Sequence, residues 1–452
     1  MGNSEARLIN GPIGKTLFRM ANPMVWGMFA VISLNLVDTF FVARLGTDEL
    51  AAVTFTFPFV IVLMNLAIGL SVGTGSVVSR AIGRGDCEQV RRLTTDSLII
   101  SLAIMFCFTV VGFLAGSSVF KLLGATKAII PLSWEYMSVW LIGLPFVVVP
   151  MVGNAAMNSA GEVKLPALMM FFAAIVNLVL DPLLIFGLWG FPQMGVQGAA
   201  LATVIAYSST CFIALWLLSY KMKMLTAHLK FKEMIASWKA MLHIAIPSAT
   251  AQMIVPMING ISLWMLAHYG PAVVASYGIV SRLEAFSLII LYAISTSLGA
   301  FVGQNWGAKK YDRVQRAIQL GYYFAFCWGL GLTVILGLCS TLIPGFFNTD
   351  PEVINTVSYY LLTVPLSYGA VGCIYIFTAS LNAIGKPMIA SSIMILRHVL
   401  IYLPMALIAV IWYGVPGIFA AITLSNLVVG LGAFALTNRF LQPCEKLHLS
   451  RE

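Results

Sequence analysis

Long apolar stretches, separated by short polar connections, follow one another along almost the whole chain. A helix needs about 20 apolar residues to cross the hydrocarbon core of a bilayer. The pattern predicts twelve such helices and therefore an all-α, polytopic membrane protein. The predicted spans are residues 16–43, 51–79, 93–116, 129–153, 163–188, 194–219, 240–267, 273–303, 317–342, 354–380, 388–412 and 416–437.

Composition and charge placement agree with this topology. The chain of 452 residues is 60% hydrophobic and only 10% charged, whereas soluble domains carry about 25% charged residues. The lysines and arginines behind the net charge of +9 lie almost entirely on one side of the predicted membrane, since the only ones in the connections on the other side are Arg44, Lys121 and Lys127. The positive-inside rule then places both termini in the cytoplasm. The basic excess is a topology signal, so we expect no nucleic-acid partner.

The amino-terminal apolar run is too long for the core of a cleaved signal peptide. The seven cysteines form no CxxC pair, and we expect neither disulfides nor a metal site. No ATPase motif is present: GPIGKT (11–16) lacks the first glycine of a phosphate-binding loop. Energy for any transport would come from an ion gradient or from a partner, and we expect no cofactor.

The two halves of the sequence repeat each other at one constant offset, the one that pairs Gly46 with Gly270. At this offset, the stretch 71–92 matches 295–316 at several glycine, valine and arginine positions. Six spans therefore repeat as six spans in the same orientation, which is one known plan of secondary transporters. We predict an N-lobe (1–220), a cytoplasmic linker (221–239) and a C-lobe (240–452), related by a pseudo-twofold axis along the membrane normal.

Two acids inside predicted spans are the main candidates for chemistry. Asp38 follows Asn35 by three residues and Asp181 follows Asn177 by four, so each acid shares a helical face with an amide. Both acids are expected about 9–12 Å below the outer ends of their spans. Burial and a second carboxylate both disfavour the charged form, so proton exchange is the expected chemistry. A structural hydrogen bond is the alternative role, especially for Asp181, which precedes Pro182.

Other intramembrane features keep two interpretations each. Pro23 precedes Asp38 on the same span, where it is either a hinge or a static kink. Substrate binding, gating and structural pairing all remain open for four further ionisable residues, namely Arg282, Glu284, Arg397 and His398.

The sequence resembles the multidrug and toxic compound extrusion (MATE) transporters, and within them the DinF-like branch. The resemblance rests on NLVDTFFVARLG (35–46), NLVLDP (177–182) and the paired six-span halves. It implies two six-helix bundles arranged in a V, and export of cationic or amphipathic organic compounds by a monomer in a bacterial inner membrane. It further implies a proton site at Asp38 and Asp181, a hinge at Pro23, and a polar network of Asn35, Asn177, Asn154, Tyr136 and Thr203.

Three alternatives stay open beside a proton-driven exporter, which would not be an enzyme. The first is a sodium-coupled MATE exporter, although the predicted seventh span carries Gln252 and no acid. The second is a flippase for lipid-linked oligosaccharides, whose pyrophosphate would favour a more basic cavity. The third is an intramembrane hydrolase using Ser71, because GLSVG (69–73) fits a nucleophile motif. Close helix packing is the preferred explanation of that glycine pattern, because the motif lies in an apolar span and not in a strand-turn-helix context.

Overall fold

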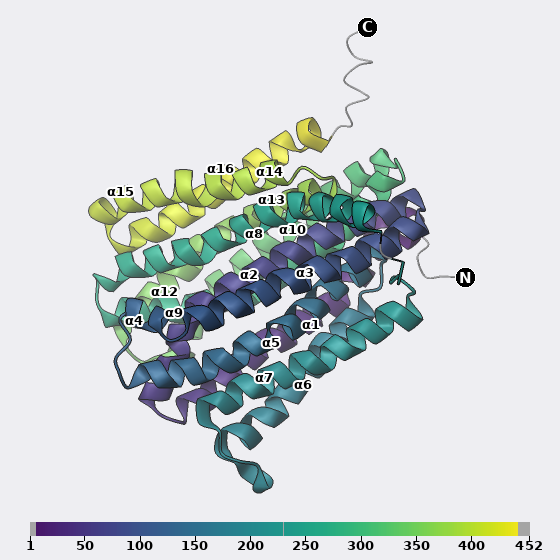
Figure 1. Cartoon of the computed structure of the whole chain (residues 1–452). Coiled ribbons are helices and arrows are strands. Elements are labelled where there is room, and N and C mark those ends of the chain that lie inside the picture. Colours follow the sequence, from purple (N-terminus) through teal and green to yellow (C-terminus); the bar gives the residue numbers. More distant parts are fainter. Residues whose placement is uncertain (1–5, 229, 442–452) are drawn as a thin grey trace. The chain divides into compact units, whose positions relative to one another are not determined.

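The computed structural model describes residues 6–228 and 230–441 and, within that part of the chain, contains helices and no strand. Twelve helical segments are long and apolar enough to cross a membrane, and each coincides with a predicted span, so the all-α, twelve-span prediction is confirmed (Figure 1). The elements are η1 (Arg7–Ile9), α1 (Ile13–Ala43), α2 (Thr47–Arg84), α3 (Cys87–Ala115), α4 (Ser118–Leu122), α5 (Ile129–Ser159), α6 (Lys164–Phe186), η2 (Leu188–Gly190), α7 (Gly195–Trp216), η3 (Leu217–Lys221), α8 (Phe231–Ala267), α9 (Pro271–Gly307), α10 (Tyr311–Leu338), α11 (Leu342–Phe347), α12 (Pro351–Thr363), η4 (Val364–Ser367), α13 (Tyr368–Ala383), α14 (Pro387–Ile395), η5 (Leu396–Tyr402), α15 (Leu403–Tyr413) and α16 (Val415–Leu441).

The helix boundaries carry the same repeat as the sequence. Helices α2 and α9 begin at Thr47 and Pro271, two positions that the sequence repeat pairs with each other. The short helices α4 and α11 also begin at paired positions, and hydropathy could not predict them because they are too short to span a bilayer. At the turns that close α5 and α13, Gly161 and Gly385 both have positive φ (78° and 85°), a conformation that glycine adopts without steric cost.

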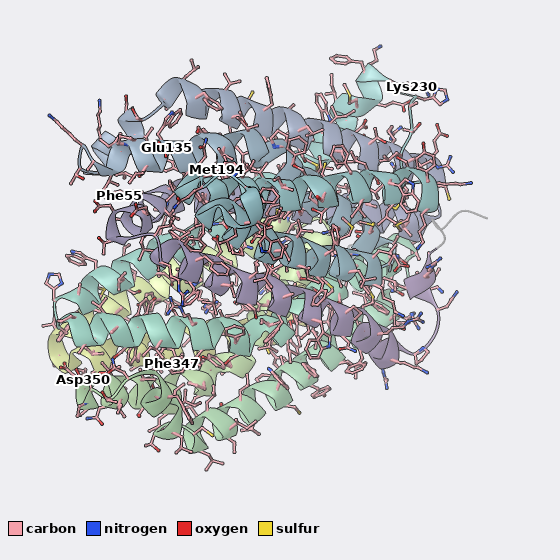
Figure 2. All side chains as sticks on the ribbon, turned by 90° about the horizontal axis from the view of Figure 1, so that it is seen from below. Phe55, Glu135, Met194, Lys230, Phe347 and Asp350 are labelled. Carbon is pink, nitrogen blue, oxygen red and sulfur yellow. The ribbon has the colours of Figure 1, made fainter. Side chains whose placement is uncertain are left out.

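The chain forms two compact units. Of the described residues, unit 1 contains Arg7 and Asn22–Ala249, and unit 2 contains Leu8–Ala21 and the chain from Thr250 onward. The boundary between them thus falls inside α8, beyond the predicted linker 221–239. Each unit has its own apolar core. Figure 2 shows Lys230 at the opposite end of unit 1 from Phe55 and Glu135, as alternating spans require.

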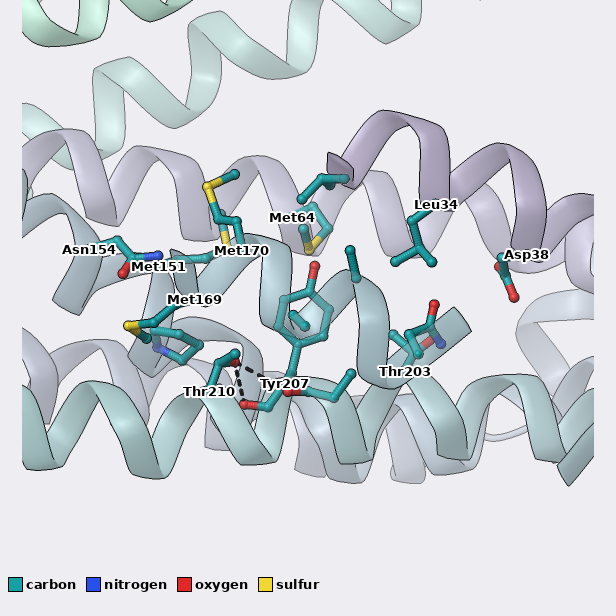
Figure 3. Close-up of a pocket in the computed structure, with 16 residues that line it drawn as sticks. Leu34, Asp38, Met64, Met151, Asn154, Met169, Met170, Thr203, Tyr207 and Thr210 are labelled. Atoms are coloured by element: carbon teal, nitrogen blue, oxygen red, sulfur yellow. Dashed lines mark hydrogen bonds between the residues drawn. The ribbon is translucent and has the colours of Figure 1, made fainter. Parts of the chain in front are cut away.

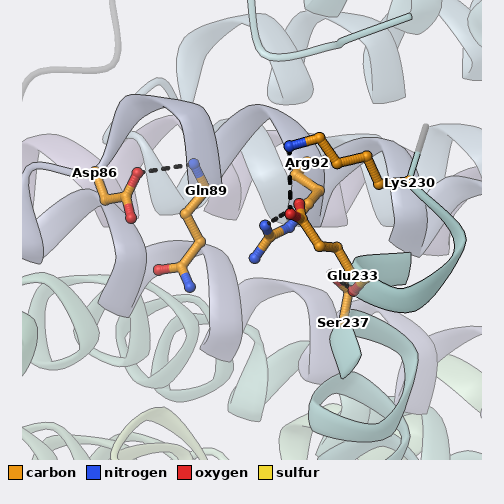
Figure 4. A network of polar contacts seen from close by, with 6 residues as sticks. All are labelled: Asp86, Gln89, Arg92, Lys230, Glu233 and Ser237. Carbon is orange, nitrogen blue, oxygen red and sulfur yellow. Dashed lines mark hydrogen bonds and ion pairs between the residues drawn. The ribbon is translucent and has the colours of Figure 1, made fainter. Parts of the chain in front are cut away.

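Helix α8 starts earlier than the predicted span because its first turns pack within unit 1. Arg92 of α3 forms an ion pair with Glu233 near the start of α8 (N–O 2.5 Å), and Lys230 also contacts Glu233 (Figure 4). Further along, α8 passes so close to α2 that a Cβ at Gly69 would lie 2.5 Å from the Cβ of Ala249. Polar residues at a helix start look like a loop in a hydropathy profile, although they continue the helix.

The GLSVG stretch is therefore a helix-packing motif. It lies within α2, where Gly69 and Gly73 meet Ala249 and Met241 of α8. The Ser71 hydroxyl donates a hydrogen bond to the carbonyl of Ala67 one turn earlier (2.9 Å). A nucleophile elbow requires a strand-turn-helix context, and this serine sits in the middle of a helix. The packing interpretation is confirmed.

In unit 2, the segment before α1 is held by the turn between α9 and α10. Asn305 donates a hydrogen bond to the carbonyl of Leu8 (3.2 Å), and Arg313 donates to the carbonyl of Gly11 (3.0 Å). Lys310 donates to the carbonyl of Ile9 (3.0 Å). Part of the first helix of the chain therefore belongs to unit 2, as part of the first helix of the second half belongs to unit 1.

The crossing of α10 and α13 generates a stability prediction. A Cβ at Gly329 would lie 2.2 Å from the backbone nitrogen of Gly369, whereas a Cβ at Gly331 would meet nothing within 4 Å. Gly329→Ala should therefore force the two helices apart and destabilise unit 2 by about 1–3 kcal/mol. Thermal unfolding of the purified protein in detergent measures the effect. Gly331→Ala on the same helix is the matched control, and equal unfolding temperatures for the two variants would contradict the proposed close contact.

Candidate functional site

A cavity of about 220 Å³ lies within unit 1 between α1, α2, α5, α6 and α7. Figure 3 shows Asp38 and Leu34 of α1 toward one end of it and Asn154 and Met169 toward the other. Its lining is mostly apolar with a few polar groups, as is usual for sites that take small organic molecules. The lining residues are Val31, Leu34, Asp38, Met64, Pro150, Met151, Asn154, Met169, Met170, Ala173, Ala174, Asn177, Thr203, Ala206, Tyr207 and Thr210.

Asp181 is positioned by its own helix. The amide Nδ2 of Asn177, one turn earlier on α6, donates a hydrogen bond to Asp181 Oδ1 (2.9 Å) and lies 3.5 Å from the hydroxyl of Thr203 on α7. The Asp181 side chain is fully buried, and within the described structure its second oxygen has no hydrogen-bond partner. The spacing of four residues that the sequence showed therefore produces a direct amide-to-carboxylate contact.

The two predicted acids share one environment. Asp38 lines the cavity, and Asp181 lies behind Asn177, which lines the same cavity. The carboxylates of Asp38 and Asp181 are close enough to interact electrostatically, and the buried Tyr136 of α5 interacts with both. Among the described residues, Asp38 Oδ1 also has no hydrogen-bond partner. Two acids from helices far apart in the sequence, α1 and α6, thus form a single acidic cluster in an apolar setting.

The remaining predicted site residues are distributed as follows. Asn154 lines the cavity from α5, and its Oδ1 has no partner in the part of the structure described. Thr203 lines it from α7. Asn35 lies on α1, but its side chain falls outside the described residues. Pro23 lies inside α1, directly after the unit boundary at Ala21, and its role as hinge or static kink stays a prediction.

Sequence reasoning missed several cavity residues. The ring of Tyr207 and the thioethers of Met64, Met151, Met169 and Met170 line the cavity. The chain has 22 methionines and 15 tyrosines, so no pattern in the sequence distinguishes these five from the others. Methionine adapts its shape to different apolar ligands, which suits a site of broad specificity. Among the described residues, no group of three or more His, Cys, Asp and Glu side chains could hold a metal ion.

Unit 2 places its ionisable residues differently. Arg282 is exposed. Glu284 of α9 accepts a hydrogen bond from the Tyr360 hydroxyl (2.9 Å), and Arg397 donates through Nε to Asn426 Oδ1 of α16 (2.8 Å). The ring nitrogen Nδ1 of His398 lies 3.0 Å from the carbonyl of Met394, a contact within one helix. This favours a packing role for the histidine and leaves Arg397 as a buried polar group and Glu284 as a half-buried one.

The family model MatE matches residues 23–183 and 247–408, one segment in each half of the chain. The protein belongs to the MATE family. The resemblance inferred from the two aspartate motifs and the paired halves is thereby confirmed at the level of the family. The two matched segments begin at positions that the internal repeat pairs with each other.

Known proteins support the same family assignment for this MATE protein. A FAD transporter of Shewanella oneidensis is 36% identical over 96% of this chain and 97% of its own. A probable multidrug resistance protein of Bacillus subtilis, YoeA, is 24% identical over 83% of this chain and 84% of its own. The Vibrio cholerae MATE transporter VcmN in the bent form is 28% identical, covers 95% of this chain and 97% of its own, and superposes with a TM-score of 0.89.

The different burial of the two acids generates a labelling prediction. A hydrophobic carbodiimide reacts with protonated carboxyl groups in apolar surroundings. Asp38 borders the cavity and Asp181 is fully buried behind Asn177, so Asp38 should be modified first. Because the reagent needs the protonated acid, modification should increase as the pH is lowered. Peptide mass spectrometry locates the adduct.

Asp38→Asn is the control for this labelling, since it should remove the first adduct. Faster modification of Asp181 than of Asp38 would contradict the proposed access from the cavity.

Proposed function

We propose that this MATE protein is a proton-coupled exporter of amphipathic organic compounds, a DinF-like member acting as a monomer in a bacterial inner membrane with cytoplasmic termini. The observation that carries the proposal is the cluster formed by Asp38 and Asp181 beside one cavity. Buried ionisable groups in membrane spans are expensive to maintain and mark ion pathways. Among the described residues, no basic side chain forms an ion pair with either acid.

Proton uptake changes the forces in this cluster. Two negative charges in a low-dielectric site repel each other, and one bound proton removes that repulsion. Protonation of the unpartnered Oδ2 would turn that oxygen into a hydrogen-bond donor, while Oδ1 can keep its contact with Asn177, so the cluster gains a donor that needs a new acceptor. Since Asp38 sits on α1, which also contains Pro23, a change at the acid can be transmitted to the helix. We propose bending at Pro23 as the step that reshapes the cavity and releases cargo outward.

Sodium is the alternative coupling ion. The unpartnered oxygens of Asp38, Asp181 and Asn154 are of the type that hard cations prefer. The proton is favoured because the hydrogen bond from Asn177 to Asp181 already occupies one carboxylate oxygen. The resemblance also assigns a sodium site in the second half to an acid on the seventh span, and this chain carries Gln252 and no acid on that span.

The cargo has two candidates. Cationic amphipathic compounds fit the acidic, methionine-lined cavity of unit 1, and the relative YoeA is named as a probable multidrug resistance protein. A flavin dinucleotide is the second candidate, because the relative that is 36% identical over nearly the whole chain is named as a FAD transporter. The flippase for lipid-linked oligosaccharides gains no comparable observation.

Proteoliposomes test the coupling. With the lumen representing the side to which cargo is exported, an acidic lumen should drive accumulation of a cationic dye, and a sodium gradient alone should not. Asp38→Asn and Asp181→Asn should reduce the gradient-driven accumulation to the level of protein-free liposomes, because a neutral amide cannot exchange a proton. Asp48→Asn, which removes an exposed acid at the start of α2, is the matched control.

Full gradient-driven transport by Asp38→Asn would eliminate the proton mechanism proposed for this site. Accumulation driven by sodium at equal pH on both sides would establish the alternative. Liposomes assayed with FAD in place of the dye distinguish the two cargo candidates.

A further inference from the structure

Unit 2 contains a buried polar cluster at the place that repeats the acidic cluster of unit 1. Tyr136 and Tyr360 are paired by the same offset that pairs Gly46 with Gly270. Tyr136 interacts with the two acids of unit 1, and Tyr360 donates its hydroxyl to Glu284 in unit 2. The duplicated scaffold therefore keeps a tyrosine beside a carboxylate in each unit. What differs between the units is the charge of the groups around that tyrosine.

Arg397 is the group that has no counterpart in the acidic cluster of unit 1. It lies on the π-helical turn η5, and its side chain is only 9% exposed. Its Nε donates to Asn426 (2.8 Å), whose Nδ2 in turn donates to the hydroxyl of Ser367 (2.9 Å). A chain of hydrogen bonds across α16 and η4 thus fixes the orientation of the guanidinium. π-Helical turns within α-helices occur frequently at functional sites.

The charge of Arg397 is only partly compensated. Glu284 interacts with it electrostatically, but among the described residues no ion pair joins them within 4.0 Å. Within the described part of the chain, the Nε of Arg397 donates one hydrogen bond, and its two terminal nitrogens form none. A buried cation without a contacting anion is costly. Its terminal N–H groups form the planar fork that binds phosphate oxygens in pairs.

Two tyrosines belong to the surroundings of Arg397. Tyr375 of α13 interacts electrostatically with both Arg397 and Glu284. Its ring packs edge to face on that of Tyr292 of α9, with centroids 6.1 Å apart, and the Tyr292 side chain is 38% exposed. Flat aromatic ligands stack on such rings, and tyrosine adds a polar group at the edge. The cluster therefore combines a guanidinium, a group well suited to phosphate, with aromatic rings.

We propose that Arg397 in unit 2 binds the phosphoryl group of a soluble aromatic organic phosphate, with Tyr375 and Tyr292 beside its ring system. This inference rests on the second cargo candidate of the proposed function, the flavin nucleotides. It assigns the anionic part of such a cargo to unit 2 and not to the acids of unit 1. A purely structural role, in which the arginine only joins η5 to α16 through Asn426, is the competing explanation.

Equilibrium binding to the purified protein tests the assignment without any ion gradient, so its outcome is independent of proton coupling. FMN and riboflavin differ by one phosphoryl group, and quenching of their fluorescence reports binding. The parent protein should bind FMN at least about tenfold more tightly than riboflavin, since hydrogen bonds to charged groups contribute about 1.5–3 kcal/mol. Arg397→Gln should remove that difference and leave riboflavin affinity unchanged within about twofold.

Two further variants separate binding from folding. Arg397→Lys keeps the charge but loses the paired geometry, so it should retain an intermediate preference for FMN. Arg282→Gln, which removes an exposed arginine of the same unit, should retain the full preference. If Arg397→Gln does not fold, the comparison of FMN with riboflavin in the parent still decides, because equal affinities there overturn the proposal.

Other results would also overturn it. Equal FMN affinity in the parent and Arg397→Gln would exclude the guanidinium as the phosphoryl ligand. An equal loss of riboflavin and FMN binding in the variant would indicate the structural role. Nanodiscs containing phosphatidylglycerol or only phosphatidylcholine test the lipid source of phosphate. If anionic nanodiscs abolish FMN binding by the parent protein but do not change FMN binding by Arg397→Gln, the site belongs to a lipid headgroup instead of cargo.

Discussion

The hydrogen bond from Asn177 to Asp181 holds a carboxyl group among apolar helices, where its second oxygen has no hydrogen-bond partner among the described residues. Asp38 brings a second carboxyl group into the same cluster, and no basic side chain among the described residues forms an ion pair there. Such an arrangement is unfavourable in a low-dielectric interior unless a cation or proton shares it. The proposed transport cycle follows from this constraint, since the cluster has a different preferred geometry for each state of charge.

The duplicated scaffold allows the two units to carry different chemistry. Tyr136 and Tyr360 occupy equivalent positions, yet one lies beside two acids and the other beside a glutamate near Arg397. Helix boundaries and turn glycines repeat because packing depends on backbone path and side-chain size. In the proposed function, the charged residues of the two clusters differ because they bind different ligands and do not determine the helix packing. An exporter built in this way can hold its coupling ion and part of its cargo in separate units.

Much of the architecture was predictable because the bilayer imposes simple rules. Spans must be apolar and about 20 residues long, so all twelve were recognised, and Asp38 and Asp181 were conspicuous as acids within them. The asparagine one turn before Asp181 identified its partner correctly, since helical geometry makes that pair local. The start of α8 was harder to predict from the sequence, because its first polar turns are held by tertiary contacts such as the one between Arg92 and Glu233.

The sequence alone determined the helical class, the twelve spans, the internal duplication and the acids available for coupling, because each of these is recorded in local hydropathy, local spacing or direct repetition. Only the tertiary structure decided which methionines line the cavity, that Asp38 lines it while Asp181 lies behind Asn177, and that Arg397 is buried against Asn426. These features join residues on different helices. Their proximity depends on how side chains of many helices fit together, which no single stretch of sequence encodes.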